Sequence, residues 1–176
     1  MWGDDLRRLA ELLRTRDELD SKIAEVTGRS ARQGDVGEFI AAQVFDIELA
    51  NTATQAGHDG KFRSGPLKGA TANVKMYGDA VAGIDLSPHP CDFHLVLSGP
   101  RRPAGASRHH RWRIFAVYLF ATGRLIDLLN ERSVKIGIAT SVRRSDLETA
   151  RIFPDARLTP SLLLTEEQGR LLSLFC

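Results

Sequence analysis

The start of the chain has the hydrophobic pattern of an amphipathic helix. Between Asp4 and Val26, leucine and isoleucine recur three to six positions apart among charged residues, at Leu6, Leu9, Leu13, Leu19 and Ile23. This spacing places apolar side chains on one side of a helix, and Gly28 is expected to end it. Residues 1–28 therefore predict an N-terminal helical arm. The arm either packs on the rest of the chain or pairs with another protein, a second copy or a different partner.

Residues 29–176 alternate between helical and strand-like segments. A helix is predicted from about Ser30 to Val44, with Ser30 as its N-cap. Strands are predicted where apolar and β-branched residues lie between turn-forming residues, at Phe45–Ala50, His58–Phe62, Ala72–Tyr77, Asp92–Leu97 and Arg113–Phe120. The last of these is apolar on both faces, which is typical of a central strand.

The C-terminal third continues the alternation. A helix at Gly123–Glu131 followed by a strand at Val134–Thr140 indicates a crossover, and hence at least one parallel pair in a mixed sheet. Further helices are predicted at Ser145–Ala150 and Thr165–Phe175, the second of which opens with the pattern of a capping box. The expected fold is a single α/β domain, a mixed β-sheet flanked by helices, preceded by the helical arm.

Composition narrows the class of protein. The chain has 176 residues, of which 43% are hydrophobic and 26% charged, which excludes disordered and collagenous chains. The longest apolar run, Ile114–Ala121, is too short to cross a bilayer, and the N-terminus lacks the apolar core of a signal peptide. We therefore expect a cytoplasmic protein with no membrane partner. Cys91 and Cys176 are expected to be reduced.

Basic residues are concentrated in two segments, although the net charge is only +2. Five arginines and no acid lie between positions 101 and 113, and four basic residues and no acid lie between positions 61 and 75. Such segments suit a polyanion, because each neutralised phosphate releases counterions. Solvated loops are the alternative. The residues expected to bind nucleic acid are Lys61, Arg63, Lys68, Arg101, Arg102, Arg108 and Arg111.

Glu38 is the only charged residue between positions 36 and 45. On a helix its neighbours include the small residues Gly34, Ala41 and Ala42, so this face can approach a sheet closely. A carboxylate held there is partly desolvated, which is unfavourable unless a cation, a metal or hydrogen-bond donors meet it. Glu38 is therefore either a site residue or half of a structural ion pair.

Two further polar positions follow on neighbouring predicted strands. Asp59 stands in a Gly-His-Asp-Gly turn, where an ordinary turn aspartate is the alternative reading. Strand alternation puts Asn73 and Lys75 on one face, about 7 Å apart, with Tyr77 beyond them. A metal-assisted phosphodiester hydrolase needs oxygen ligands for a divalent cation and a nearby ammonium group. The set that supplies them is Glu38, Asp59, Asn73 and Lys75.

With these motifs the chain resembles the PD-(D/E)XK restriction-endonuclease-like superfamily. That superfamily carries an acid on its first core helix, an aspartate on a strand, and an acid-x-Lys on the next strand. The stretches that match here are Gly37–Ala42, His58–Phe62 and Asn73–Lys75. The chain is also similar to a prokaryotic branch of the superfamily that has an Asn-x-Lys variant of the motif.

The resemblance implies a restriction-endonuclease-like core and a Mg²⁺- or Mn²⁺-dependent nuclease that hydrolyses phosphodiester bonds, in DNA rather than RNA. Glu38 and Asp59 would be carboxylate ligands of the metal, Asn73 a third and neutral ligand, and Lys75 the catalytic lysine. Asn73 departs from the usual acid or Gln, and residues 79–90 offer little helix where the superfamily core has one. The alternative is a catalytically weak or inactive nucleic-acid-binding or assembly subunit on the same fold.

Other chemistry has less support in the sequence. His89, Cys91 and His94 have close spacing, but strand alternation would put Cys91 and His94 on opposite faces, which argues against zinc. Trp112 and Tyr118 are expected in the core, and Asp92 in a structural role. Loop motifs for nucleotide binding and for a serine nucleophile are missing from the sequence.

Overall fold

The structure is a computed structural model that describes residues 2–50, 57–86, 91–101, 112–156 and 162–176. In this part of the chain it contains five helices: α1 (Trp2–Thr27), α2 (Gln33–Phe45), α3 (Thr122–Glu131), α4 (Arg144–Ala150) and α5 (Glu166–Ser173). The strands are β1 (Ile47–Leu49), β2 (Gly60–Phe62), β3 (Thr71–Tyr77), β4 (Gly83–Ile84), β5 (Phe93–Ser98), β6 (Ala116–Ala121), β7 (Thr140–Ser141) and β8 (Arg151–Phe153). The α/β class and the N-terminal helix are as the sequence predicts.

The main sheet has six strands in the order β1-β2-β3-β5-β6-β8. Neighbouring strands are antiparallel except for β3 and β5, which run parallel with Asn73 opposite His94 and Lys75 opposite Val96. A second sheet consists of β4 and β7. The sheet is therefore mixed, and its parallel pair lies at its centre.

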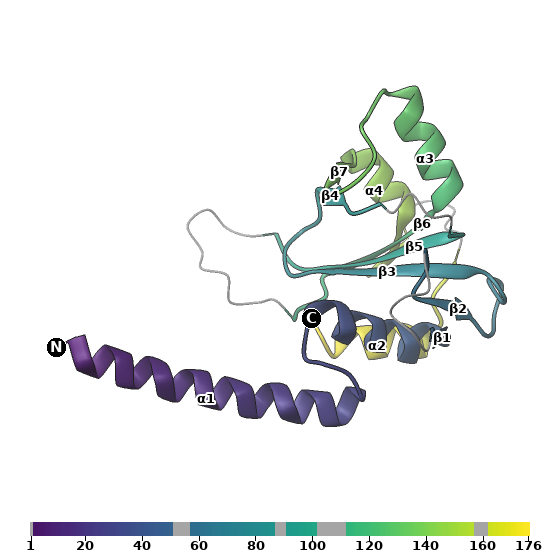
Figure 1. Cartoon of the computed structure of the whole chain (residues 1–176). Coiled ribbons are helices and arrows are strands. Elements are labelled where there is room, and N and C mark those ends of the chain that lie inside the picture. Colours follow the sequence, from purple (N-terminus) through teal and green to yellow (C-terminus); the bar gives the residue numbers. More distant parts are fainter. Residues whose placement is uncertain (1, 51–56, 87–90, 102–111, 157–161) are drawn as a thin grey trace.

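Helices cover both faces of the main sheet (Figure 1). On one face, α2 and α5 lie over a core to which β3 contributes Ala72, Val74 and Met76. On the other face, α3 and α4 pack over a second core that includes Val96 and Phe120. The alternation predicted for β3 is confirmed, because its even-numbered residues belong to the first core.

The ends of α5 and α1 follow their sequence signals. Thr165 Oγ1 accepts the Gln168 N–H at 3.2 Å, and Gln168 Oε1 accepts the Thr165 N–H at 3.0 Å, which completes the predicted capping box. Gln168 also donates to the Val44 carbonyl at 3.0 Å, which ties α5 to α2. Gly28 follows α1 with φ +65°, a conformation that glycine adopts without strain.

Four expectations were wrong. Residues 134–139 do not form a strand, because Ser133 and Ala139 take φ near +50°, which interrupts an extended run. The short β7 that follows pairs antiparallel with β4, so the parallel pair comes from β3 and β5 instead. Arg32, not Ser30, is the N-cap of α2, and Trp112 is 41% exposed.

Two other features agree with expectation. Within the described residues 78–86 there is no helix between β3 and β5, which matches the departure noted in the sequence. The Asp92 carboxylate accepts the N–H and the hydroxyl of Thr71, both at 2.7 Å, and these bonds lower the pKa of Asp92. None of the helices in the described part of the chain has the length and apolar character required to span a bilayer.

The contact between α2 and β3 generates a prediction about stability. A Cβ at Gly37 would lie 2.7 Å from Met76 Cβ, so Gly37→Ala should destabilise the protein by about 1–3 kcal/mol through overpacking. Gly34→Ala is the matched control, because nothing lies within 4 Å of a Cβ there, and it should stabilise by up to about 1 kcal/mol. Urea unfolding of both variants measures the difference. Equal effects would show that α2 does not need the close approach.

Candidate active site

Glu38 lies on α2 next to Gly37, where the helix packs closely on Met76 of β3. Its side chain is 21% exposed and forms an ion pair with Arg29, in the segment that joins α1 to α2. Burial raises the pKa of Glu38, and the negative charge of Asp59 raises it further, while Arg29 acts in the opposite direction. Glu38 thus forms the ion pair that the sequence analysis gave as an alternative, and its partner is Arg29, just after the arm.

Asp59 lies immediately before β2 and is fixed to β3 by two hydrogen bonds. Its backbone N–H donates to the Ala72 carbonyl at 2.9 Å, and its Oδ2 accepts the Val74 N–H at 2.6 Å. Backbone pairing between β2 and β3 stops here, and the Asp59 carboxylate accepts the Val74 N–H in place of a backbone carbonyl of β2. Because Val74 stands between Asn73 and Lys75, Asp59 is bound to the centre of the Asn-x-Lys motif.

Arg29 connects the parts of this region. Besides Glu38, it reaches the Ala50 carbonyl with Nη2 at 3.5 Å, and the Ala50 N–H donates to the Asp59 carbonyl at 2.8 Å. One guanidinium thus touches the helix that carries Glu38 and the chain beside Asp59. Two carboxylates and one arginine occupy this end of β1 and β2.

Asn73 and Lys75 lie on the face of β3 opposite α2. Asn73 is buried, and its Oδ1 has no hydrogen-bond partner among the described residues. Lys75 is half-buried and forms no ion pair within that part of the chain. The structure thus groups Glu38 with Asp59, joins Asp59 to the β3 backbone, and places Asn73 and Lys75 on the far side of that strand.

A buried histidine stands next to Asn73 in the parallel pair. His94 Nδ1 lies 2.9 Å from Thr122 Oγ1 and 3.6 Å from Cys91 Sγ, and its Nε2 has no partner among the described residues. Burial, together with the charge of Lys75, lowers the pKa of His94 to about 4, so the ring is neutral at pH 7. His94 therefore presents an unused ring nitrogen beside the Asn-x-Lys motif.

The contact between Cys91 and His94 corrects the argument from alternation. Cys91 precedes β5 and is not part of the strand, so its side chain turns to the same side as His94. Burial raises the pKa of the Cys91 thiol, which keeps it protonated. His89 lies outside the described residues. Among those described, no group of three or more His, Cys, Asp and Glu side chains is arranged to hold a metal.

The basic residues expected to bind nucleic acid divide into three groups. Lys61 and Lys68 are exposed, and Lys61 pairs with Thr71, so it shares the face of Asn73 and Lys75. Arg63 is exposed but bound to the Asp46 carboxylate. Arg101 is exposed. The remaining three, Arg102, Arg108 and Arg111, lie outside the described residues.

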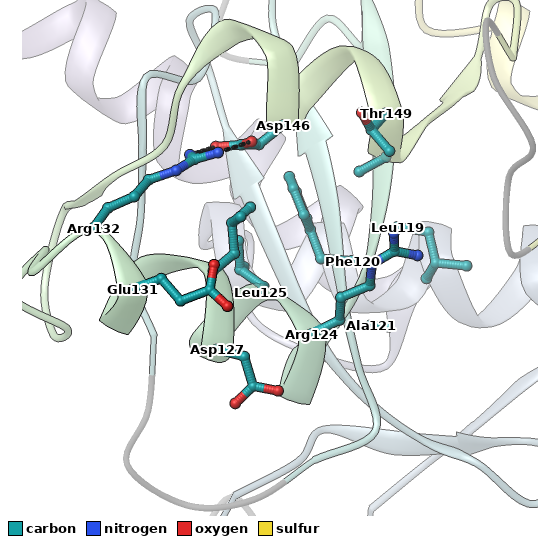
Figure 2. Close-up of a pocket in the computed structure, with 12 residues that line it drawn as sticks. Leu119, Phe120, Ala121, Arg124, Leu125, Asp127, Glu131, Arg132, Asp146 and Thr149 are labelled. Carbon is teal, nitrogen blue, oxygen red and sulfur yellow. Dashed lines mark hydrogen bonds and ion pairs between the residues drawn. The ribbon is translucent and has the colours of Figure 1, made fainter.

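A pocket of about 380 Å³ lies away from these residues, between α3, α4 and the end of β6. Figure 2 shows Phe120 and Leu125 in this pocket, and the Arg132–Asp146 ion pair between the two helices. Arg132 Nη1 and Asp146 Oδ2 are 2.6 Å apart, and this pair joins α3 to α4. The pocket belongs to the second core and not to the candidate active site.

Two residues of the site were not found from the sequence. The sequence indicates that Glu38 needs a cation, a metal or donors, but the local pattern around Arg29 does not distinguish it from Arg32. For His94, the sequence spacing suggests only zinc. Its position opposite Asn73 depends on the parallel register of β3 and β5, which the pattern of apolar residues does not specify.

Comparison of the chain with protein-family models gives no match, and comparison with curated proteins gives none either.

The pairing of carboxylates can be tested by titration. Asp59→Asn removes a charge that raises the pKa of Glu38 and keeps an oxygen that can accept the Val74 N–H, so the pKa of Glu38 should fall. Arg29→Gln removes an opposing charge and should raise it. Carbon NMR of the Glu38 carboxyl follows both midpoints. An unchanged midpoint in Asp59→Asn would mean that the two carboxylates do not share a site.

Proposed function

We propose that this protein is a metal-dependent phosphodiester hydrolase that acts on nucleic acid, DNA rather than RNA. The observation that carries the proposal is the position of Asp59. Its carboxylate is hydrogen-bonded to the backbone between Asn73 and Lys75 and contributes to the raised pKa of Glu38. An acid on a helix, an aspartate just before a strand and an x-Lys motif on the next strand thus follow one another in the order of the superfamily that the sequence resembles.

The residues present fit a divalent cation with few charged ligands. Glu38 pairs with Arg29 through Oε2 and Asp59 binds Val74 through Oδ2, so the other oxygen of each carboxylate has no partner among the described residues. Asn73 Oδ1 is a further oxygen without a partner in that part of the chain. Glu38 and Asp59 would hold Mg²⁺ or Mn²⁺. The side chain of Asn73 lies on the other face of β3, so its amide oxygen would have to reach this cation past the edge of the strand. When bound, the cation would lower the pKa of a water molecule and offset phosphate charge.

The roles of the other residues follow from their charge and position. The Lys75 ammonium would orient the attacking water or stabilise the negative charge that develops on the phosphorus oxygens. The neutral His94 beside it would not compete with Lys75 for an anion at pH 7. Lys61, exposed on the same face as Lys75, would contact the nucleic-acid backbone.

A second candidate function is a nucleic-acid-binding subunit without catalysis. The ion pair between Arg29 and Glu38 favours it, because the guanidinium already neutralises the carboxylate that would bind a metal. The neutral Asn73 favours it as well, since a site with two carboxylates binds a divalent cation less tightly than one with three. The two functions differ in whether a divalent cation binds and whether the nucleic acid is cleaved.

A nuclease assay over a titration of Mn²⁺ and Mg²⁺ tests the enzyme. Wild type should cleave weakly and require millimolar metal, with Mn²⁺ preferred, and Asn73→Asp should raise both metal affinity and cleavage. Lys75→Ala should lower turnover by about 100-fold or more while DNA binding persists. Lys135→Ala, an exposed lysine outside the proposed site, is the matched control. Absence of cleavage by wild type and Asn73→Asp on single- and double-stranded substrates would leave the binding subunit.

Binding across a range of salt concentrations tests the basic residues separately. Lys61→Ala, Lys68→Ala and Arg101→Ala should each weaken binding to all sequences, and each should reduce the salt slope by about 0.9 log units on duplex DNA. Arg63→Ala is the comparison, because its guanidinium is bound to Asp46 and should contribute less. Fluorescence anisotropy measures the slopes. If all four variants keep the salt slope of wild type, these residues do not contact phosphates.

A further inference from the structure

Arg29 lies between the arm and the helix that carries Glu38. It follows Gly28 at the end of α1 and precedes α2. Its guanidinium forms an ion pair with Glu38, one of the two carboxylates proposed to hold a metal. A positive group of the protein itself is therefore bound to a ligand of the candidate site.

The guanidinium and a divalent cation compete for the same carboxylate. A metal bound at about 2.1 Å to the other oxygen of Glu38 would lie within about 7 Å of the guanidinium on Oε2. Two positive groups at this separation repel each other, and the repulsion is stronger in a partly buried place than in water. Glu38 therefore binds a metal less tightly while Arg29 remains on it.

The other contacts of Arg29 allow its side chain to leave. Its second side-chain contact, from Nη2 to the Ala50 carbonyl, is 3.5 Å long and therefore weak. Water also reaches the ion pair, because 31% of the Arg29 side chain and 21% of the Glu38 side chain are exposed. A guanidinium that separates from Glu38 can thus be solvated at once.

The end of α1 holds the backbone of Arg29. Thr27 Oγ1 accepts the Arg29 N–H at 3.2 Å and donates to the Arg29 carbonyl at 2.9 Å. The Gly28 N–H between them donates to the Ala24 carbonyl at 2.8 Å. The last turn of α1 thus fixes the point from which the Arg29 side chain reaches Glu38.

We propose that Arg29 is an autoinhibitory residue that occupies Glu38 in the metal-free protein, and that the end of α1 sets the strength of this contact. This role rests on the proposed function, since it requires Glu38 to be a metal ligand. Metal binding and release of Arg29 are then coupled, so a change that loosens the hold of α1 on Arg29 raises the metal affinity. A purely structural ion pair has no such coupling.

The metal affinity of the full chain tests the inhibition without a cleavage assay. Electron paramagnetic resonance measures free Mn²⁺ during a titration at pH 8, well above the usual range of carboxyl pKa values. Arg29→Gln should bind Mn²⁺ about 10-fold more tightly than wild type, because a competing charge is lost. Arg32→Gln makes the same charge change on an exposed side chain three residues away, and it should stay within about twofold of wild type.

The contribution of α1 is tested by Thr27→Val. This change removes both hydrogen bonds to the Arg29 backbone and keeps the β-branched shape, so the Mn²⁺ affinity should rise by about threefold. Thr15→Val is the control, because the Thr15 hydroxyl bonds to the Glu11 carbonyl within α1. Circular dichroism confirms that α1 remains helical in both variants. A wild-type affinity in Thr27→Val would contradict the role of α1.

Release of the guanidinium can be observed by NMR of the arginine Nε–H groups. Saturating Mg²⁺ should shift the signal of Arg29 but not that of Arg63, which remains bound to Asp46. Equal Mn²⁺ affinities in wild type and Arg29→Gln, or an unchanged Arg29 signal, would overturn the role of Arg29 and leave the proposed function standing. If wild type, Arg29→Gln and Asn73→Asp all fail to bind metal, both proposals are wrong.

Discussion

The close approach of α2 to β3 is the constraint on which the rest of the structure depends. Gly37 has no side chain, so the helix backbone can lie directly on Met76, and the first core closes beneath it. The same approach determines how far Glu38 is withdrawn from water. The hydrogen bond from Gln168 to the Val44 carbonyl adds α5 to the same layer. Gly37 therefore influences both the packing of the first core and the candidate site.

The candidate site brings negative charges together in a partly buried place. Burial and the charge of Asp59 both oppose ionisation of Glu38, and Arg29 compensates for part of this cost. With both carboxylates ionised, the single guanidinium leaves one negative charge uncompensated. A divalent cation could compensate it, so the same residues are compatible with a binding subunit and with a hydrolase.

The sequence predicts most of the fold because long periodic segments leave a clear pattern. It misplaced residues 134–140, since an apolar alternation also suits an irregular segment that packs on a core. For the site, the sequence correctly required a partner for Glu38, but the choice of Arg29 depends on how the arm joins the domain. The contact of Cys91 with His94 was missed because Cys91 lies just outside β5, where strand alternation no longer applies.

The junction between arm and domain gives α1 a mechanical property. The helix has 26 residues and is about 39 Å long, and it meets the domain at Gly28, one residue before Arg29. A rotation of about 10° at this junction would move the far end of α1 by about 7 Å, as follows from that length. A change in the direction of α1 would therefore be large at its N-terminus and small at Arg29, the residue that forms the ion pair with Glu38.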